Sequence, residues 1–143
     1  MLASQAGAQI TKMISDITPN LLRLLNSIIS PQGKHARLSI LIYHRILTDK
    51  DPMLIDEMDA KSFDWQLKIL AKYFNPLSLS IAIEKLKNGS LPARSVCVTF
   101  DDGYADNADV ALPILQRWNI PATFFLATGF LNGGIMWNDI IIE

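Results

Sequence analysis

Ser95-Val-Cys-Val-Thr-Phe-Asp-Asp-Gly-Tyr104 is the stretch that decides the fold. Its first six residues, 95–100, are mostly apolar or β-branched, which predicts a strand covered on both faces, as in a parallel sheet. The strand has to end where Asp101 and Asp102 begin, because an ionised carboxylate without a partner is costly to bury. Gly103 can adopt a left-handed conformation and permits a sharp turn. We therefore expect both carboxylates at the rim of a parallel sheet.

The rest of the chain alternates between predicted strands and helices. The expected strands are 38–43, 74–77, 95–100 and 122–127, and the expected helices begin near Ser62, Ser78 and Asp106. This alternation predicts parallel strands joined by right-handed crossover helices. About four strands can be drawn, whereas a closed barrel needs about eight. The predicted fold class is therefore α/β, an incomplete (β/α) barrel, in which Pro113 should bend the last helix.

Residues 1–36 are interpreted as a helical appendage that precedes this domain. Thr18 and Pro19 are suited to the start of a helix. The helix would carry a broad apolar face made of Leu21, Leu22, Leu25, Ile28 and Ile29. Docking of this face on the domain is the preferred interpretation. Attachment to a membrane surface is the alternative, but few basic residues flank the face.

Composition narrows the class of protein. Of the 143 residues, 50% are hydrophobic and 19% charged, which favours a folded domain over disorder. The net charge of −1 and the scattered positions of the 13 Lys and Arg residues argue against a nucleic-acid partner. No segment reaches transmembrane length and no secretory signal pattern is visible, so a cytoplasmic location is expected by default. Cys97, the sole cysteine, is predicted to be a small core residue.

Three segments together resemble a known family. Thr99-Phe-Asp-Asp-Gly103, followed by Tyr104 and by Ile120-Pro-Ala-Thr-Phe-Phe-Leu126, is similar to the first motif and next strand of the polysaccharide deacetylases, the NodB homology family of carbohydrate esterases. Leu41-Ile-Tyr-His-Arg45 resembles the family's opening strand. Residues 37–143 are therefore interpreted as the amino-terminal portion of such a domain. The resemblance implies a distorted barrel that removes N-acetyl or O-acetyl groups from a polysaccharide or another glycan.

The same resemblance assigns roles to the two aspartates. It implies that Asp101 is the general base and Asp102 a ligand of a divalent metal. Consecutive residues of a strand point to opposite faces, so both can serve one site only if the chain turns at Gly103, which is therefore counted as structural support. Hydrolysis of an acetamide suits such a pair, because a cation polarises the carbonyl while a carboxylate removes a proton from water. Zn is the expected metal, with Co, Ni and Mn left open. Without the resemblance, an acidic loop in which Asp101 or Asp102 caps the next helix would explain the pair as well.

The chain contains only part of the ligand set that the family implies. The family adds two histidines spaced His-x-x-x-His downstream, whereas His35 and His44 both precede Asp102. Residues 1–143 alone are therefore expected to bind divalent metal poorly and to lack deacetylase activity. A module of the same fold that binds carbohydrate or another partner without catalysis is the alternative function. A phosphotransfer domain ranks third, because the strand that ends at Ala127 brings no further Asp or Lys.

Three aromatic or imidazole side chains have more than one interpretation. His44, at the end of the first strand, serves either a structural hydrogen bond or a role in orienting a ligand or substrate. Tyr104 either lines the sugar site or covers the turn, and Trp137 either stacks on a sugar ring or anchors a loop. Trp65 and Trp118 lie on predicted helices and are predicted to be core residues. The expected partner is an N-acetylated glycan, while its identity and the oligomeric state stay open.

Overall fold

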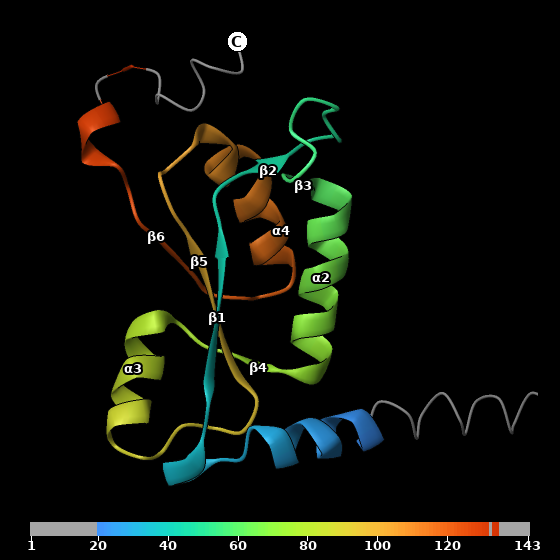
Figure 1. The fold of residues 1–143 in the computed structure, drawn as a ribbon, viewed down its shortest axis with the longest axis vertical. Coiled ribbons are helices and arrows are strands. Elements are labelled where there is room, and N and C mark those ends of the chain that lie inside the picture. Colours follow the sequence, from blue (N-terminus) through green and yellow to red (C-terminus); the bar gives the residue numbers. More distant parts are fainter. Residues whose placement is uncertain (1–19, 132, 135–143) are drawn as a thin grey trace, which may run out of the picture.

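The computed structural model describes residues 20–131, 133 and 134 as a parallel sheet with helices on both faces (Figure 1). The elements are η1 (Gly33–His35), β1 (Leu38–Tyr43), β2 (Ile46–Leu47), β3 (Met58–Asp59), α2 (Ala60–Tyr73), β4 (Asn75–Pro76), α3 (Leu79–Lys87), β5 (Ser95–Phe100), η2 (Asn107–Ala111), α4 (Leu112–Arg117), β6 (Ala122–Phe124) and η3 (Thr128–Phe130). Residues 20–29 are also helical. The alternation of strands and helices predicted from the sequence is therefore confirmed.

The strands of the main sheet are arranged around β5. β1 pairs with β5 in parallel over its whole length, from Leu38 opposite Ser95 to Tyr43 opposite Phe100. β4 pairs with the first two residues of β5 and β6 with the last three, also in parallel. Because β1 occupies one edge of β5 along its entire length, β4 and β6 share the other edge. β2 and β3 form a separate parallel pair that the sequence did not predict.

β5 is the centre of the core, and all of its residues are buried. Val96, Val98 and Phe100 pack in a large cluster with residues of β1, β6, α2 and α4. Cys97 points to the other face and packs with Ala82 of α3 in a smaller cluster. Figure 1 shows α2 and α4 on one side of β5 and α3 on the other. The prediction of a strand covered on both faces is confirmed. Burial in the smaller cluster raises the pKa of the Cys97 thiol.

The helices begin next to capping residues, but the N-cap of one helix differs from the predicted residue. The N-cap of α2 lies three residues before the predicted one, because Asp59 rather than Ser62 takes this position. The Asp59 carboxylate accepts a hydrogen bond from the Ser62 N–H at 2.6 Å, and this bond lowers the pKa of Asp59. The helix α3 begins after Ser78, as predicted, and its C-cap is Asn88.

The helix after the aspartate pair contains a π-helical turn directly before its proline. In η2 the N–H of Leu112 donates to the carbonyl of Asn107, which is the wider π-helical spacing. Pro113 then lies in the first turn of α4, where an α-helix does not require its missing amide proton. Asn119 follows the end of the helix in a left-handed conformation with φ of 52°.

Burial differs from the sequence prediction in two elements. β1 was expected to be a buried strand, but of its six residues only Tyr43 is buried, and Ile40 and Ile42 are 46% and 61% exposed. Their face of the sheet is the one that carries Cys97, and α3 covers only part of it. Trp65 was expected in the core but is 65% exposed. Trp118 does pack against the large cluster.

The helix at residues 20–29 contacts the domain through polar groups. The Arg23 guanidinium donates to the Lys72 carbonyl at the end of α2, and the Arg94 N–H donates to the Ser30 carbonyl at 3.0 Å. Its apolar side chains are exposed: Leu21, Leu22, Leu24, Leu25, Ile28 and Ile29. Docking through the apolar face, which the sequence favoured, is therefore not what the structure shows. Within the described part of the chain, no helix is long and apolar enough to cross a membrane.

Candidate active site

The carboxyl ends of β1, β5 and β6 lie next to one another at the same end of the sheet. Tyr43, Phe100 and Phe124 are in register with one another as the last residues of their strands. The Asp101 N–H continues the ladder by donating to the Tyr43 carbonyl at 2.9 Å. Consequently the chain after β1, which starts at His44, leaves the sheet beside the aspartate pair. The structure thus brings the His44 and Asp101 backbones together, as the strand-end position of both residues suggested.

The turn after β5 is tighter than a simple change of direction at the glycine. The Gly103 N–H donates to the Asp101 carbonyl at 2.9 Å, which closes a three-residue turn around Asp102. Asp102 has φ of 72° and Gly103 φ of 77°, so two consecutive residues are left-handed. This conformation is unfavourable for a residue with a Cβ and persists where its surroundings impose it. Because the turn begins at Asp102 itself, the two carboxylates do not follow the alternation of an extended strand.

Gly103 is required at its position for a second reason besides its positive φ. A Cβ built on it would lie 2.6 Å from Leu126 Cδ2 and 3.5 Å from the Leu126 Cα. The segment that follows β6 also binds the turn through its backbone, because the Ala127 N–H donates to the Asp102 carbonyl at 3.2 Å. Gly103 therefore lets the aspartate turn and the chain after β6 approach closely.

The carboxylates of Asp101 and Asp102 are partly exposed and have no protein partner in the described part of the chain. Neither of them caps the next helix, so the loop interpretation of the pair finds no support. Oxygen atoms without donors at the edge of a sheet fit a hard or borderline cation. Yet no three His, Cys, Asp or Glu side chains among the described residues are grouped so as to hold a metal ion. The described residues thus offer carboxylates suited to a metal site but not a complete set of ligands.

Two charged side chains that were not predicted as site residues, Arg45 and Asp106, lie beside this turn. Asp106 forms an ion pair with Arg45, with 2.9 Å between Oδ2 and Nε, and it links the turn to the end of β1. The Arg45 guanidinium also lies over the Tyr104 ring, 4.6 Å from its centroid. Tyr104 is partly buried there, and its carbonyl accepts a hydrogen bond from the Asn107 N–H at 3.0 Å. Trp137, the remaining aromatic candidate, lies outside the described residues.

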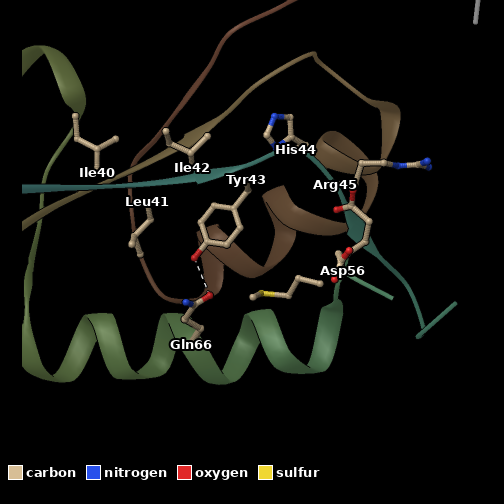
Figure 2. A pocket seen from close by; sticks show the side chains of 10 residues that line it. Ile40, Leu41, Ile42, Tyr43, His44, Arg45, Asp56 and Gln66 are labelled. Carbon is tan, nitrogen blue, oxygen red and sulfur yellow. Dashed lines mark hydrogen bonds between the residues drawn. The ribbon is translucent and has the colours of Figure 1, made fainter. Parts of the chain in front are cut away.

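A hollow of about 550 Å³ runs along β1 next to His44. It is lined by residues 40–45, 56–58 and Gln66. Figure 2 shows Leu41 and Tyr43 pointing toward Gln66 of α2, while Ile40 and Ile42 point the opposite way. The Tyr43 hydroxyl donates to Gln66 Oε1 at 2.7 Å, and burial raises the pKa of Tyr43 to about 12. Tyr43 therefore fixes one wall of the hollow, and His44, which follows it, is exposed.

Because its pKa is raised, the Tyr43 hydroxyl should ionise only at a higher pH than an exposed tyrosine. Folding stabilises the neutral phenol, so its contribution to stability is complete below the unfolded pKa of about 10 and is lost as the pH rises through about 12. The variant Tyr43→Phe should remove one tyrosinate signal with a midpoint near 12. Ultraviolet difference titration of the wild type against the variant measures it. A lost signal with a midpoint near 10 would contradict the buried, hydrogen-bonded position of this hydroxyl.

Comparisons with known proteins find similar sequences among the polysaccharide deacetylases. Residues 88–139 match the polysaccharide deacetylase family model. The chain is 32% identical over 97 residues to the putative polysaccharide deacetylase YxkH of Bacillus subtilis, a match that covers 65% of this chain and 33% of the relative. It is 33% identical over 82 residues to the poly-beta-1,6-N-acetyl-D-glucosamine N-deacetylase of Staphylococcus epidermidis, covering 57% of this chain and 27% of that protein.

The fold is similar to that of solved deacetylases. The structure of IcaB from Ammonifex degensii superposes with a TM-score of 0.61 at 27% identity, over 74% of this chain and 43% of that one. The chain thus contains part of a domain that is similar to the polysaccharide deacetylases of the NodB type. It spans a third or less of the length of the curated relatives named above. The α/β fold and the family resemblance predicted from the sequence are confirmed.

Proposed function

We propose that this chain supplies the carboxylate side of the active site of a metal-dependent glycan deacetylase. The observation that carries the proposal is the turn at Asp101, Asp102 and Gly103. It presents two carboxylates, free of partners among the described residues, at the carboxyl edge of a parallel sheet. Enzymes built on (β/α) barrels place their chemistry at this edge. Asp102 would be a metal ligand and Asp101 the general base.

The two aspartates would divide the work of hydrolysis. A bound divalent cation supplies polarisation of the acetyl carbonyl and a lowered pKa of water. Asp102 contributes a hard oxygen ligand and holds its carboxylate in place through its left-handed turn. Asp101 accepts a proton from the attacking water on a carboxylate oxygen, and its backbone stays bonded to the end of β1. Zn is the proposed metal, with Co, Ni and Mn as the other candidates.

The proposed substrate is an N-acetylated glycan. The relative from Staphylococcus epidermidis is a poly-beta-1,6-N-acetyl-D-glucosamine N-deacetylase, and this likeness favours an acetamide over an O-acetyl ester. A module that binds glycan without catalysis would use the same fold. It would not need a cation at the aspartate pair, so metal binding separates the two functions.

Metal binding by the chain itself tests the proposal. In an NMR titration with Mn²⁺, the amide signals of residues 101–104 should broaden at millimolar concentrations, because part of the ligand set is present. Asp102→Asn should abolish this broadening, and Asp101→Asn should reduce it less. The matched control is Asp109→Asn, which removes the same charge from an exposed position on the following helix and should change nothing. Equal broadening in the wild type and Asp102→Asn would refute Asp102 as a ligand.

A further inference from the structure

Asp106 is the most fully hydrogen-bonded carboxylate near the aspartate pair. Its Oδ2 accepts from Arg45 Nε at 2.9 Å, and its Oδ1 accepts from the Ile46 N–H at 3.3 Å. When the side-chain amide of Asn107 is oriented with its nitrogen toward Asp106, this nitrogen donates to Asp106 Oδ1 at 3.1 Å and to the His44 carbonyl at 3.0 Å. Arg45 and Asp106 are 28% and 14% exposed. The Asp106 carboxylate thus accepts hydrogen bonds both from the segment after β1 and from the start of η2.

These contacts join two segments that are far apart in the sequence. His44, Arg45 and Ile46 follow β1, whereas Asp106 and Asn107 open the helix after the aspartate turn. Arg45 also covers the Tyr104 ring, so it contacts the residue that directly follows Gly103. The turn at Asp101 and Asp102 is therefore held from its far end by this cluster, and from its near end by the Asp101 N–H on the Tyr43 carbonyl.

Asp106 is not suited to be a ligand or a base itself. Both of its oxygens are engaged by donors, and its side chain is largely removed from solvent. Asp101 and Asp102 have the opposite character, since their carboxylates are partly exposed and accept nothing from the described residues. The structure therefore separates the three acids into two presented to solvent and one that is tied to the protein.

We propose that Asp106 is a positioning residue, which holds the Asp101–Asp102 turn in register with the end of β1 through Arg45, Ile46 and Asn107. Its role in metal binding rests on the function proposed above, while its role in holding the turn does not. A left-handed Asp102 persists only if the surrounding structure imposes it, and the Asp106 cluster is that structure on the helix side. Without it the turn relaxes and the carboxylates no longer face a cation together.

Hydrogen exchange on the whole chain tests the positioning role. In Asp106→Asn an amide N–H₂ can face the Arg45 Nε, so the charge-assisted bond is lost. The amide protons of Asp101 and Gly103 should then exchange at least about tenfold faster, while those of Val96 and Val98 in β5 keep their rates. Asp109→Asn is the control for the charge. Arg45→Met, which leaves Asp106 two of its donors, should act in the same direction with a smaller effect.

A second readout separates positioning from general destabilisation. In the folded Asp106→Asn variant, the Mn²⁺ affinity read from broadening at residues 101–104 should fall about tenfold, as found for groups that orient metal ligands. Exchange that accelerates equally throughout β5, or no more at Asp101 than in Asp109→Asn, would overturn the proposal. If wild-type broadening does not depend on Asp102, the proposed function fails, and the exchange rates alone still decide whether Asp106 holds the turn.

Discussion

Phe100→Ala is expected to lower the free energy of unfolding by about 3–5 kcal/mol, the usual cost of emptying a buried aromatic site. The Phe100 side chain is 0% exposed. Its ring stacks on Tyr43 and Phe124 at centroid distances of 5.3 and 5.0 Å and meets the edge of Phe63 at 5.9 Å. One residue thus joins β1, β5, β6 and α2 directly beneath the aspartate pair, and alanine would leave a cavity among three rings.

Urea unfolding of the two chains measures this effect. Phe130→Ala is the control, because Phe130 lies in η3 with 42% of its surface exposed and should change the stability by no more than about 0.5 kcal/mol. Since Phe100 immediately precedes Asp101, the variant should also loosen the aspartate turn. A loss of less than about 1 kcal/mol in Phe100→Ala would mean that the ring cluster is not the centre of the core.

The strands were predictable where the sequence carries local signals. Residues 38–43 and 95–100 form strands with the expected bounds, because apolar and β-branched residues dominate both stretches and polar or charged residues follow them. The last strand, expected at 122–127, ends at Phe124, since the following residues turn to bind the aspartate loop. Its length is thus set by a tertiary contact. Propensity alone does not contain that information.

Burial was less predictable than secondary structure. Ile40, Ile42 and Trp65 are apolar or aromatic, but they are exposed because no described element covers them. The N-cap of α2 shows a similar limit. Asp59 and Ser62 are both capping residues, and the path of the chain through β3 decides that Asp59 takes the position.

The aspartate turn could be predicted from the sequence, but the side chains that hold it could not. Asp101, Asp102 and Gly103 were found because a strand that ends in two carboxylates and a glycine is a local pattern. Asp106 was not found, because its partner Arg45 lies 61 residues away and meets it only through the pairing of β1 with β5. The available signal was the position of both residues just beyond the ends of paired parallel strands.

A large effect on activity is expected when Asp101 is replaced. If Asp101 is the base, its conversion to asparagine removes the proton acceptor and leaves the shape of the turn, so the Asp101 N–H keeps its bond to Tyr43. General acid and base groups typically contribute about 10²–10⁴-fold to rate. In a polypeptide that unites these residues with the remaining metal ligands, Asp101→Asn should lower kcat by that factor and retain the metal. Asp102→Asn should instead lose the metal together with the activity.

Acetate release from an N-acetylglucosamine oligomer, measured with the metal content of each variant, tests the central claim most directly. Asp101→Asn should keep its metal with a kcat about 10²–10⁴-fold lower, Asp102→Asn should be inactive and metal-poor, and Asp109→Asn should match the wild type. A kcat of Asp101→Asn close to that of the wild type, or full metal content in Asp102→Asn, would contradict the assignment of base and ligand to this pair.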